Sequence, residues 1–146
     1  MGCRIYIVED HVLMRDVLSE FIEGVPALDL CGAATTAEEA LERMGQANPD
    51  LALIDVSLPR MSGIDLVREL HQRQPELPCV MLSGHQEVTY VERALEAGAR
   101  GYVLKGDPFE IPRAIQCVLN GGTYLSGTMR GKIWGQPDPE EEEVTG

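Results

Sequence analysis

The stretch "LIDVSLPRMSGIDL", residues 53 to 66, places a carboxylate at the end of a buried apolar run. Leu53 and Ile54 are typical of a buried strand, and Asp55 follows them directly. A proline and a glycine then indicate a loop, because both residue types interrupt regular structure. Ligands of open parallel sheets bind beyond the carboxyl ends of the strands. We therefore expect Asp55 to lie at the mouth of a site and not in the core.

Apolar runs alternate with helical periodicity along the first 120 residues. The predicted strands are residues 4–8, 27–34, 50–55, 78–83 and 101–104. The predicted helices are residues 11–23, 37–46, 63–74, 88–97 and a last helix that ends near residue 120. Five strand–helix units in sequence predict an α/β fold of the doubly wound, flavodoxin-like (βα)5 type. Its parallel five-stranded sheet would have the order 2-1-3-4-5, with helices on both faces.

Capping residues place the starts of two helices. Ser62 can cap the helix over residues 63–74. Asp107 with Glu110 has the spacing of a capping box for the last helix. Pro112 then falls one turn into that helix and removes a backbone hydrogen bond. We expect an irregular first turn there.

The composition changes after residue 126, where the helical and strand periodicity stops. Residues 127–146 hold four glycines, two prolines and the acidic run "DPEEEE". Such a composition cannot bury enough apolar surface to fold alone. We assign residues 1–122 to one domain and residues 123–146 to a linker or acidic tail that is partly disordered.

The charge of the chain argues against direct contact with nucleic acid or anionic membrane. The formal net charge is −12, and residues 1–126 keep 10 basic against 19 acidic side chains, or −9. No apolar run approaches the roughly 20 residues of a membrane span. The four cysteines form no CxxC pair, which favours buried reduced thiols in a cytoplasmic protein and leaves a zinc site or a disulfide as alternatives.

Polar side chains stand at the carboxyl ends of four strands that neighbour one another in the predicted sheet. They are Glu9, Asp10, Asp55, Ser83 and Lys105. Three acids this close repel one another unless a cation lies among them. All-oxygen ligation suits Mg²⁺, which takes one or two carboxylates and keeps several waters. The sequence therefore predicts a magnesium site at this edge.

A carboxylate beside a divalent ion and an ammonium group can act as a nucleophile toward phosphorus. Aspartyl phosphates are known covalent intermediates, and metal and lysine stabilise the charge of a phosphoryl group. Each residue alone has an ordinary alternative: acids at a helix start stabilise the helix dipole, and Asp55 before a loop suits a turn. The combination on separate strand ends favours the phosphoryl site.

These residues resemble a known family. Glu9–Asp10, Asp55 followed by "LPRMSG", Ser83 and "GYVLK" match the CheY-like receiver domain of two-component response regulators. The match covers about residues 3 to 120. The stretches "LEAGARGYVLKGD" and "IQCVLNGGTYLS" are most similar to the NarL/FixJ branch, in which a helix-turn-helix DNA-binding domain usually follows.

The resemblance implies a role for each residue of the acidic cluster. Asp55 would be the phosphoacceptor, and a sensor histidine kinase would be the donor. Glu9, Asp10 and Asp55 would hold Mg²⁺ together with the backbone carbonyl of Ser57. The domain would catalyse its own phosphorylation and its slow dephosphorylation, so it would act mainly as a switch and only secondarily as an enzyme.

The resemblance also implies the switching residues. Lys105 would pair with the phosphoryl group, Ser83 would bond it, and Tyr102 would rotate in response. His85 lies two residues past Ser83, at a mouth position where it would tune water access and the rate of dephosphorylation. The readout surface would be the fourth helix, fifth strand and fifth helix, or the first and fifth helices, and phosphorylation would lead to a homodimer.

Two departures from the family pattern bear on function. Gly106 follows Lys105 where the family usually has proline, which disfavours the cis peptide often found there. No helix-turn-helix follows residue 126, so any DNA contact would come from an output domain absent from this chain. Two alternatives stay open: a phosphorylation-independent interaction module, and a phosphohydrolase, although Ser57 stands where such enzymes place a second aspartate.

Overall fold

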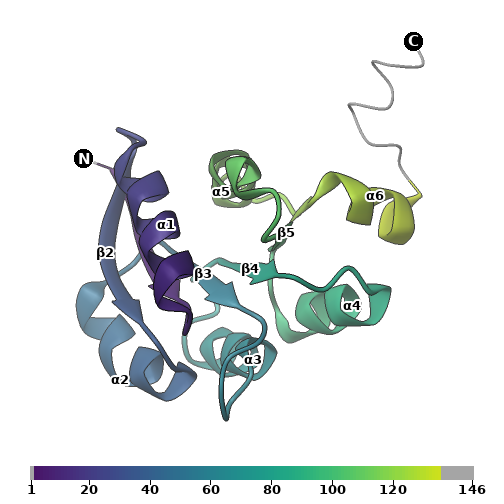
Figure 1. Ribbon diagram of the computed structural model, residues 1–146. Helices are drawn as coiled ribbons and strands as arrows, with labels where there is room; N and C mark the ends of the chain where they lie inside the picture. The colour runs from purple at the N-terminus through teal and green to yellow at the C-terminus, as the bar shows by residue number, and fades with distance from the viewer. Residues whose placement is uncertain (1, 136–146) are drawn as a thin grey trace.

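A single parallel sheet lies between two layers of helices in the computed structural model, which describes residues 2–135 (Figure 1). The strands are β1 (Cys3–Val8), β2 (Leu28–Ala34), β3 (Leu51–Asp55), β4 (Cys79–Ser83), β5 (Gly101–Leu104) and β6 (Tyr124–Leu125). The helices are α1 (Val12–Glu23), α2 (Ala37–Ala47), α3 (Gly63–Arg73), α4 (Val88–Ala97), the 3-10 turn η1 (Pro108–Glu110), α5 (Ile111–Leu119) and α6 (Gly127–Trp134).

The strand order is β2-β1-β3-β4-β5-β6, and each neighbouring pair is parallel. The doubly wound α/β fold and the order of the first five strands are thus confirmed. The expectation of five strands is corrected to six, because β6 pairs with β5 through Gly101 and Tyr102. A two-residue strand gives no alternating pattern, so the sequence did not indicate it.

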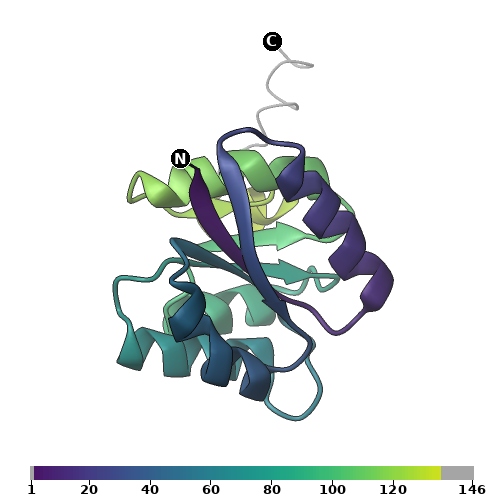
Figure 2. The same ribbon diagram turned by 90° about the vertical axis from the view of Figure 1, so that its left-hand side faces the viewer.

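Helices cover both faces of the sheet, as Figures 1 and 2 show from two directions. α1 and α5 pack on one face, while α2, α3, α4 and α6 pack on the other. Successive residues of a strand therefore bury alternate sides: Ile54 belongs to the core under α3, and Leu53 to the core under α1 and α5. β3 and β4 are buried along their whole length. This burial on both faces explains their continuous apolar sequences.

The segment assigned to a partly disordered linker or tail contains ordered structure up to residue 135. Ser126 N donates to the carbonyl of Tyr102 over 3.0 Å, so the sheet continues past residue 122. α6 follows over Gly127–Trp134, and its Met129 is fully buried. Met129 and Ile133 alone make its core contact, and two apolar residues among glycines gave no helical periodicity. Residues 136–146, with the acidic run, lie outside the described residues.

The capping predictions were right for α3 and wrong for the last helix. Ser62 Oγ accepts a hydrogen bond from Asp65 N at 3.1 Å and begins α3. The first turn of the last helix is irregular as predicted, since η1 precedes α5. Asp107 makes no side-chain cap: Glu110 N donates to the Asp107 backbone carbonyl at 3.0 Å, and the Glu110 carboxylate accepts a 2.7 Å bond from the Tyr124 hydroxyl. The bond between residues 105 and 106 is trans.

All four cysteines are free; Cys79 is buried, whereas Cys3, Cys31 and Cys117 are partly exposed, so full burial was predicted correctly for one of them. Burial raises the pKa of the Cys79 thiol to about 12, which keeps it protonated and unreactive.

Within residues 2–135, no helix combines the length and the apolar character that crossing a membrane requires.

Gly63, the first residue of α3, packs directly against the backbone of Asp55, and its substitution tests this contact. A Cβ at Gly63 would overlap the carbonyl oxygen of Asp55, and Gly63 N donates to the Val56 carbonyl at 2.9 Å. We expect Gly63→Ala to lower the free energy of unfolding in urea by about 1–3 kcal/mol, because backbone must move. The control Gly45→Ala adds a Cβ with no atom of another segment within 4 Å, in the last turn of α2, and should stabilise the protein by about 0.5–1 kcal/mol. Equal effects of the two changes would contradict the packing described here.

Candidate functional site

The carboxyl ends of β1, β3 and β5 bring three charged side chains together. Glu9 follows β1, Asp55 is the last residue of β3, and Lys105 follows β5. Lys105 Nζ lies 3.0 Å from Glu9 Oε1 and 3.0 Å from Asp55 Oδ2. Both carboxylates are almost fully buried, whereas a fifth of the Lys105 side chain remains exposed. The ammonium group thus neutralises part of a buried negative charge at the mouth of the sheet.

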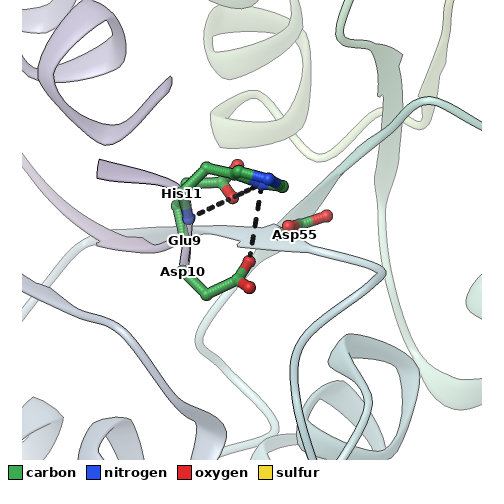
Figure 3. Close-up of side chains that lie close together, drawn as sticks. All are labelled: Glu9, Asp10, His11 and Asp55. Atoms are coloured by element: carbon green, nitrogen blue, oxygen red, sulfur yellow. Dashed lines mark hydrogen bonds and ion pairs between the residues drawn. The ribbon is translucent and has the colours of Figure 1, made fainter. Parts of the chain in front are cut away.

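Asp10 and His11 lie beside Glu9 and Asp55 (Figure 3), and both are more exposed than these two buried carboxylates. One potential ligand atom from each of Glu9, Asp10, His11 and Asp55 lies within 4.8 Å of the others. Glu9 Oε1 and Asp55 Oδ2 have the Lys105 ammonium as their partner, and Asp10 Oδ1 accepts no hydrogen bond from the described residues. Three buried carboxylate oxygens with so few donors have the arrangement expected for a divalent-cation site. The residues present therefore fit a metal ion.

The backbone holds the cluster in place. Ser57 N donates to Asp55 Oδ1 at 3.0 Å, which fixes the orientation of that carboxylate. His11 N donates to Glu9 Oε2 at 3.2 Å. The side chain of His11 is 77% exposed. Its Nδ1 nevertheless lies 3.8 Å from Glu9 Oε2 and 3.9 Å from Asp10 Oδ1, a proximity that the sequence did not indicate.

Burial and like charge perturb Glu9 strongly. Burial raises the pKa of Glu9 to about 7, the nearby Asp55 carboxylate adds to the increase, and Lys105 opposes it. Burial alone would lower the pKa of Lys105, but its bonds to Glu9 and Asp55 outweigh this and raise it. The lysine is therefore charged at neutral pH. The Glu9 carboxyl group is protonated in part of the molecules at neutral pH when no metal ion is bound.

Ser83 and Tyr102 meet at the loop between β4 and α4, residues 84–87, here called the β4–α4 loop. Ser83 Oγ accepts a hydrogen bond from His85 N at 2.9 Å. The hydroxyl of Tyr102 donates to the His85 carbonyl at 3.0 Å, and Tyr102 is fully buried. Ser83 is also buried, on the strand between those of Asp55 and Tyr102. The predicted switch residues are thus adjacent and hold the same loop.

The side chain of His85 contacts residues of the loop after β3 and of α4. Its Nε2 is 3.2 Å from Ser57 Oγ, so it bridges the loops after β3 and β4. Its ring stacks on Tyr90 with centroids 4.2 Å apart, and Glu87 lies 3.6 Å from Nδ1. The sequence did not single out Tyr90. Its position five residues after His85, in the first turn of α4, is the signal that could have identified it.

The raised pKa of Glu9 predicts a specific pH dependence of stability. Between pH 4.5, the ordinary value, and about 7, the folded chain keeps a proton that the unfolded chain has released. Stability in EDTA should therefore fall as the pH rises through this window, by at most about 3 kcal/mol. Urea unfolding at pH 5 and pH 8 measures the fall.

Two variants test whether Glu9 causes this pH dependence of stability. Glu9→Gln should remove this part of the pH dependence, because no proton is taken up at that position. Glu42→Gln changes an exposed glutamate on α2 and should keep the wild-type fall. The same fall in Glu9→Gln as in the wild type would contradict the assignment to Glu9.

Comparison with known proteins identifies the family to which this site belongs. Residues 5–116 match the family model described as "Response regulator receiver domain". The DNA-binding transcriptional activator DevR/DosR of Mycobacterium tuberculosis is 37% identical over 123 residues, which cover 84% of this chain and 57% of that protein. The transcriptional regulatory protein DegU of Brevibacillus brevis is 32% identical over 123 residues, 84% of this chain and 52% of that protein.

A solved structure agrees with these relatives. The two-component response regulator of the LuxR family from Aurantimonas sp. SI85-9A1 has a TM-score of 0.86 and 30% identity, and the match covers 99% of both chains. This neighbour supports the NarL/FixJ-type resemblance. The chain spans about half the length of the two regulators named above. The chain belongs to the family of receiver domains of two-component response regulators.

Proposed function

We propose that Asp55 accepts a phosphoryl group from the phosphohistidine of a sensor histidine kinase. The observation that carries this proposal is the position of Lys105 Nζ, 3.0 Å from the Asp55 carboxylate within the acidic cluster. A carboxylate oxygen of Asp55 attacks phosphorus, the P–N bond of the donor breaks, and the imidazole leaves and takes up a proton. Lys105 stabilises the charge on the phosphoryl oxygens.

Mg²⁺ is the cofactor that this donor set suits best, because the free atoms are carboxylate oxygens. Glu9, Asp10 and Asp55 would hold it together with the carbonyl of Ser57. When bound, the ion supplies positive charge that offsets the repulsion between the acids and the incoming phosphoryl group. The protein residues contribute orientation: Ser57 N holds one oxygen of Asp55, which leaves the other for bonding.

Phosphorylation would act as a switch through the side chains next to Asp55. The group adds about 1.5 to 2 negative charges at one point. Ser83 can donate its hydroxyl to a phosphoryl oxygen and so draw the β4–α4 loop toward Asp55. Tyr102 holds the same loop through His85 and would change its position when the loop moves. The domain thereby converts a local charge into a change of surface.

The output of this switch would lie in a part of the protein beyond the receiver domain. DevR/DosR is named a DNA-binding transcriptional activator, and DegU a transcriptional regulatory protein. By analogy, phosphorylation here controls an attached DNA-binding domain in the cytoplasm, with homodimer formation as an intermediate step. The net charge of −12 repels DNA, so the receiver itself would not contact it.

Incubation with acetyl phosphate and Mg²⁺ tests the phosphoacceptor directly. We expect intact-mass spectrometry to detect a gain of about 80 Da, one phosphoryl group. Asp55→Asn should abolish the gain, while Asp65→Asn, an exposed acid on α3, should retain it. No gain in the wild type would favour the phosphorylation-independent interaction module instead. Rapid turnover of phosphate esters would favour the phosphohydrolase.

The position of the His85 side chain leads to a prediction about how fast phosphorylated Asp55 is hydrolysed. Water must approach the phosphoryl group from the mouth, and His85 bridges Ser57 and Tyr90 on one side of it. His85→Ala should shorten the half-life of phosphorylated protein by about three- to tenfold, because access for water increases. His71→Ala, distant on α3, is the matched control. An unchanged half-life in His85→Ala would rule out this role.

A further inference from the structure

A cavity of about 380 Å³ opens between the loop after β3 and the helices α3 and α4. These two helices pack side by side on the same face of the sheet (Figure 1). The buried side chains of Val56, Leu58 and Ile64 give the cavity an apolar part. Pockets for small organic ligands measure about 300 to 1,000 Å³. The carboxylates that surround Lys105 do not line the cavity, so it is separate from the site described above.

The charge of this cavity is opposite to that of the chain. Arg68 of α3 and Arg93 of α4 line it, and Asp65 is the only acid among the described residues that do so. Arg68 is paired with Asp65 at 2.9 Å, whereas the Arg93 guanidinium has no ion pair within residues 2–135. Two guanidinium groups against one carboxylate leave a net charge of +1 here, in a chain of net charge −12. The cavity therefore attracts an anion.

Other lining residues also have hydrogen-bond donors to spare. At the start of α3, the backbone N–H groups of residues 63, 65 and 66 each have an acceptor. The N–H of Ile64 has none among the described residues, although Ile64 is almost fully buried. Ser62 Oγ accepts from Asp65 N, so its own proton is available for a ligand. The positive end of the α3 dipole favours negative charge at the same place.

The number of donors favours a phosphate ester over a carboxylate. A carboxylate offers two oxygens, whereas a phosphate monoester offers three strong acceptor oxygens. The guanidinium of Arg93 can engage two oxygens of a phosphate at once, since its planar fork matches their spacing. The N–H of Ile64 and the hydroxyl of Ser62 remain for the third. The apolar part of the cavity gives room for the organic group of the ester.

We propose that this cavity binds a small phosphate monoester with an apolar or aromatic body, and that Arg93 is the main contact of its phosphate group. The site is independent of phosphoryl transfer, because it uses none of the acids around Lys105. Its binding can therefore be measured in Asp55→Asn, in which the phosphoacceptor is absent.

Titration of the ¹⁵N-labelled full chain with phenyl phosphate, followed by NMR in EDTA, tests this site. EDTA removes metal ions that would bring the phosphate to the acidic cluster. We expect saturable shifts of the amide signals of Ile64 and Arg93 with a Kd of about 1 mM or lower, in the wild type and in Asp55→Asn alike. Inorganic phosphate should bind about tenfold more weakly, because it buries no apolar surface. Benzoate should also bind about tenfold more weakly, because it offers fewer acceptor oxygens.

Three variants assign the binding to Arg93. Arg93 is exposed, so its substitution leaves the core intact. Arg93→Gln should weaken the binding of phenyl phosphate by about tenfold or more, since hydrogen bonds to a charged group are lost. Arg93→Lys keeps the charge but not the paired donors and should have an intermediate affinity. The control Arg43→Gln removes the same charge from an exposed position on α2 and should bind as the wild type.

Each contrary result overturns a stated part of the proposal. Without saturable shifts up to about 20 mM phenyl phosphate, the cavity is not a ligand site. An unchanged affinity in Arg93→Gln, or loss of binding in Asp55→Asn, places the ligand elsewhere and overturns the site. Equal affinity for inorganic phosphate overturns the organic body, and tighter binding of benzoate overturns the phosphate group. All of these results leave the proposed function intact, because the mass gain with acetyl phosphate reports phosphorylation of Asp55 separately.

Discussion

The whole site depends on one electrostatic constraint: buried carboxylates are held close together at the end of a parallel sheet. Two unit charges 4.8 Å apart repel by about 3 kcal/mol at an effective dielectric constant of about 20. Lys105 relieves part of this repulsion between Glu9 and Asp55, and a proton on Glu9 relieves more. Asp10 remains without a compensating donor. A divalent cation would neutralise the remaining negative charge of the carboxylates, so the site is suited to bind an ion and to accept a phosphoryl group.

The sheet topology explains why much of this site could be predicted from sequence. Parallel strands end at one edge, so a residue at the end of an apolar run is placed by topology alone. Asp55, Ser83 and Lys105 were located in this way, because β3, β4 and β5 are neighbours. Burial on both faces also made these strands easy to recognise, since their sequences are apolar throughout.

The features that the sequence missed depend on contacts between segments and not on local pattern. α6 is stabilised by Met129 in a core built from α4 and β5, so its own sequence shows little periodicity. The stacking of His85 on Tyr90 requires the loop and the first turn of α4 to be placed relative to each other. Asp107 and Glu110 form no capping box: the Glu110 carboxylate is engaged by Tyr124, a residue of the unpredicted β6. Tertiary partners decided each of these cases.

Binding of Mg²⁺ in the absence of any phosphodonor tests the central claim most directly. A cation that binds only the folded chain raises its stability with concentration. We predict that the midpoint of thermal unfolding at pH 8 rises steadily as Mg²⁺ is added to EDTA-treated protein, and that Asp10→Asn largely removes the rise. A midpoint that does not respond to Mg²⁺ in the wild type would contradict the account, because the clustered carboxylates would then not form a cation site.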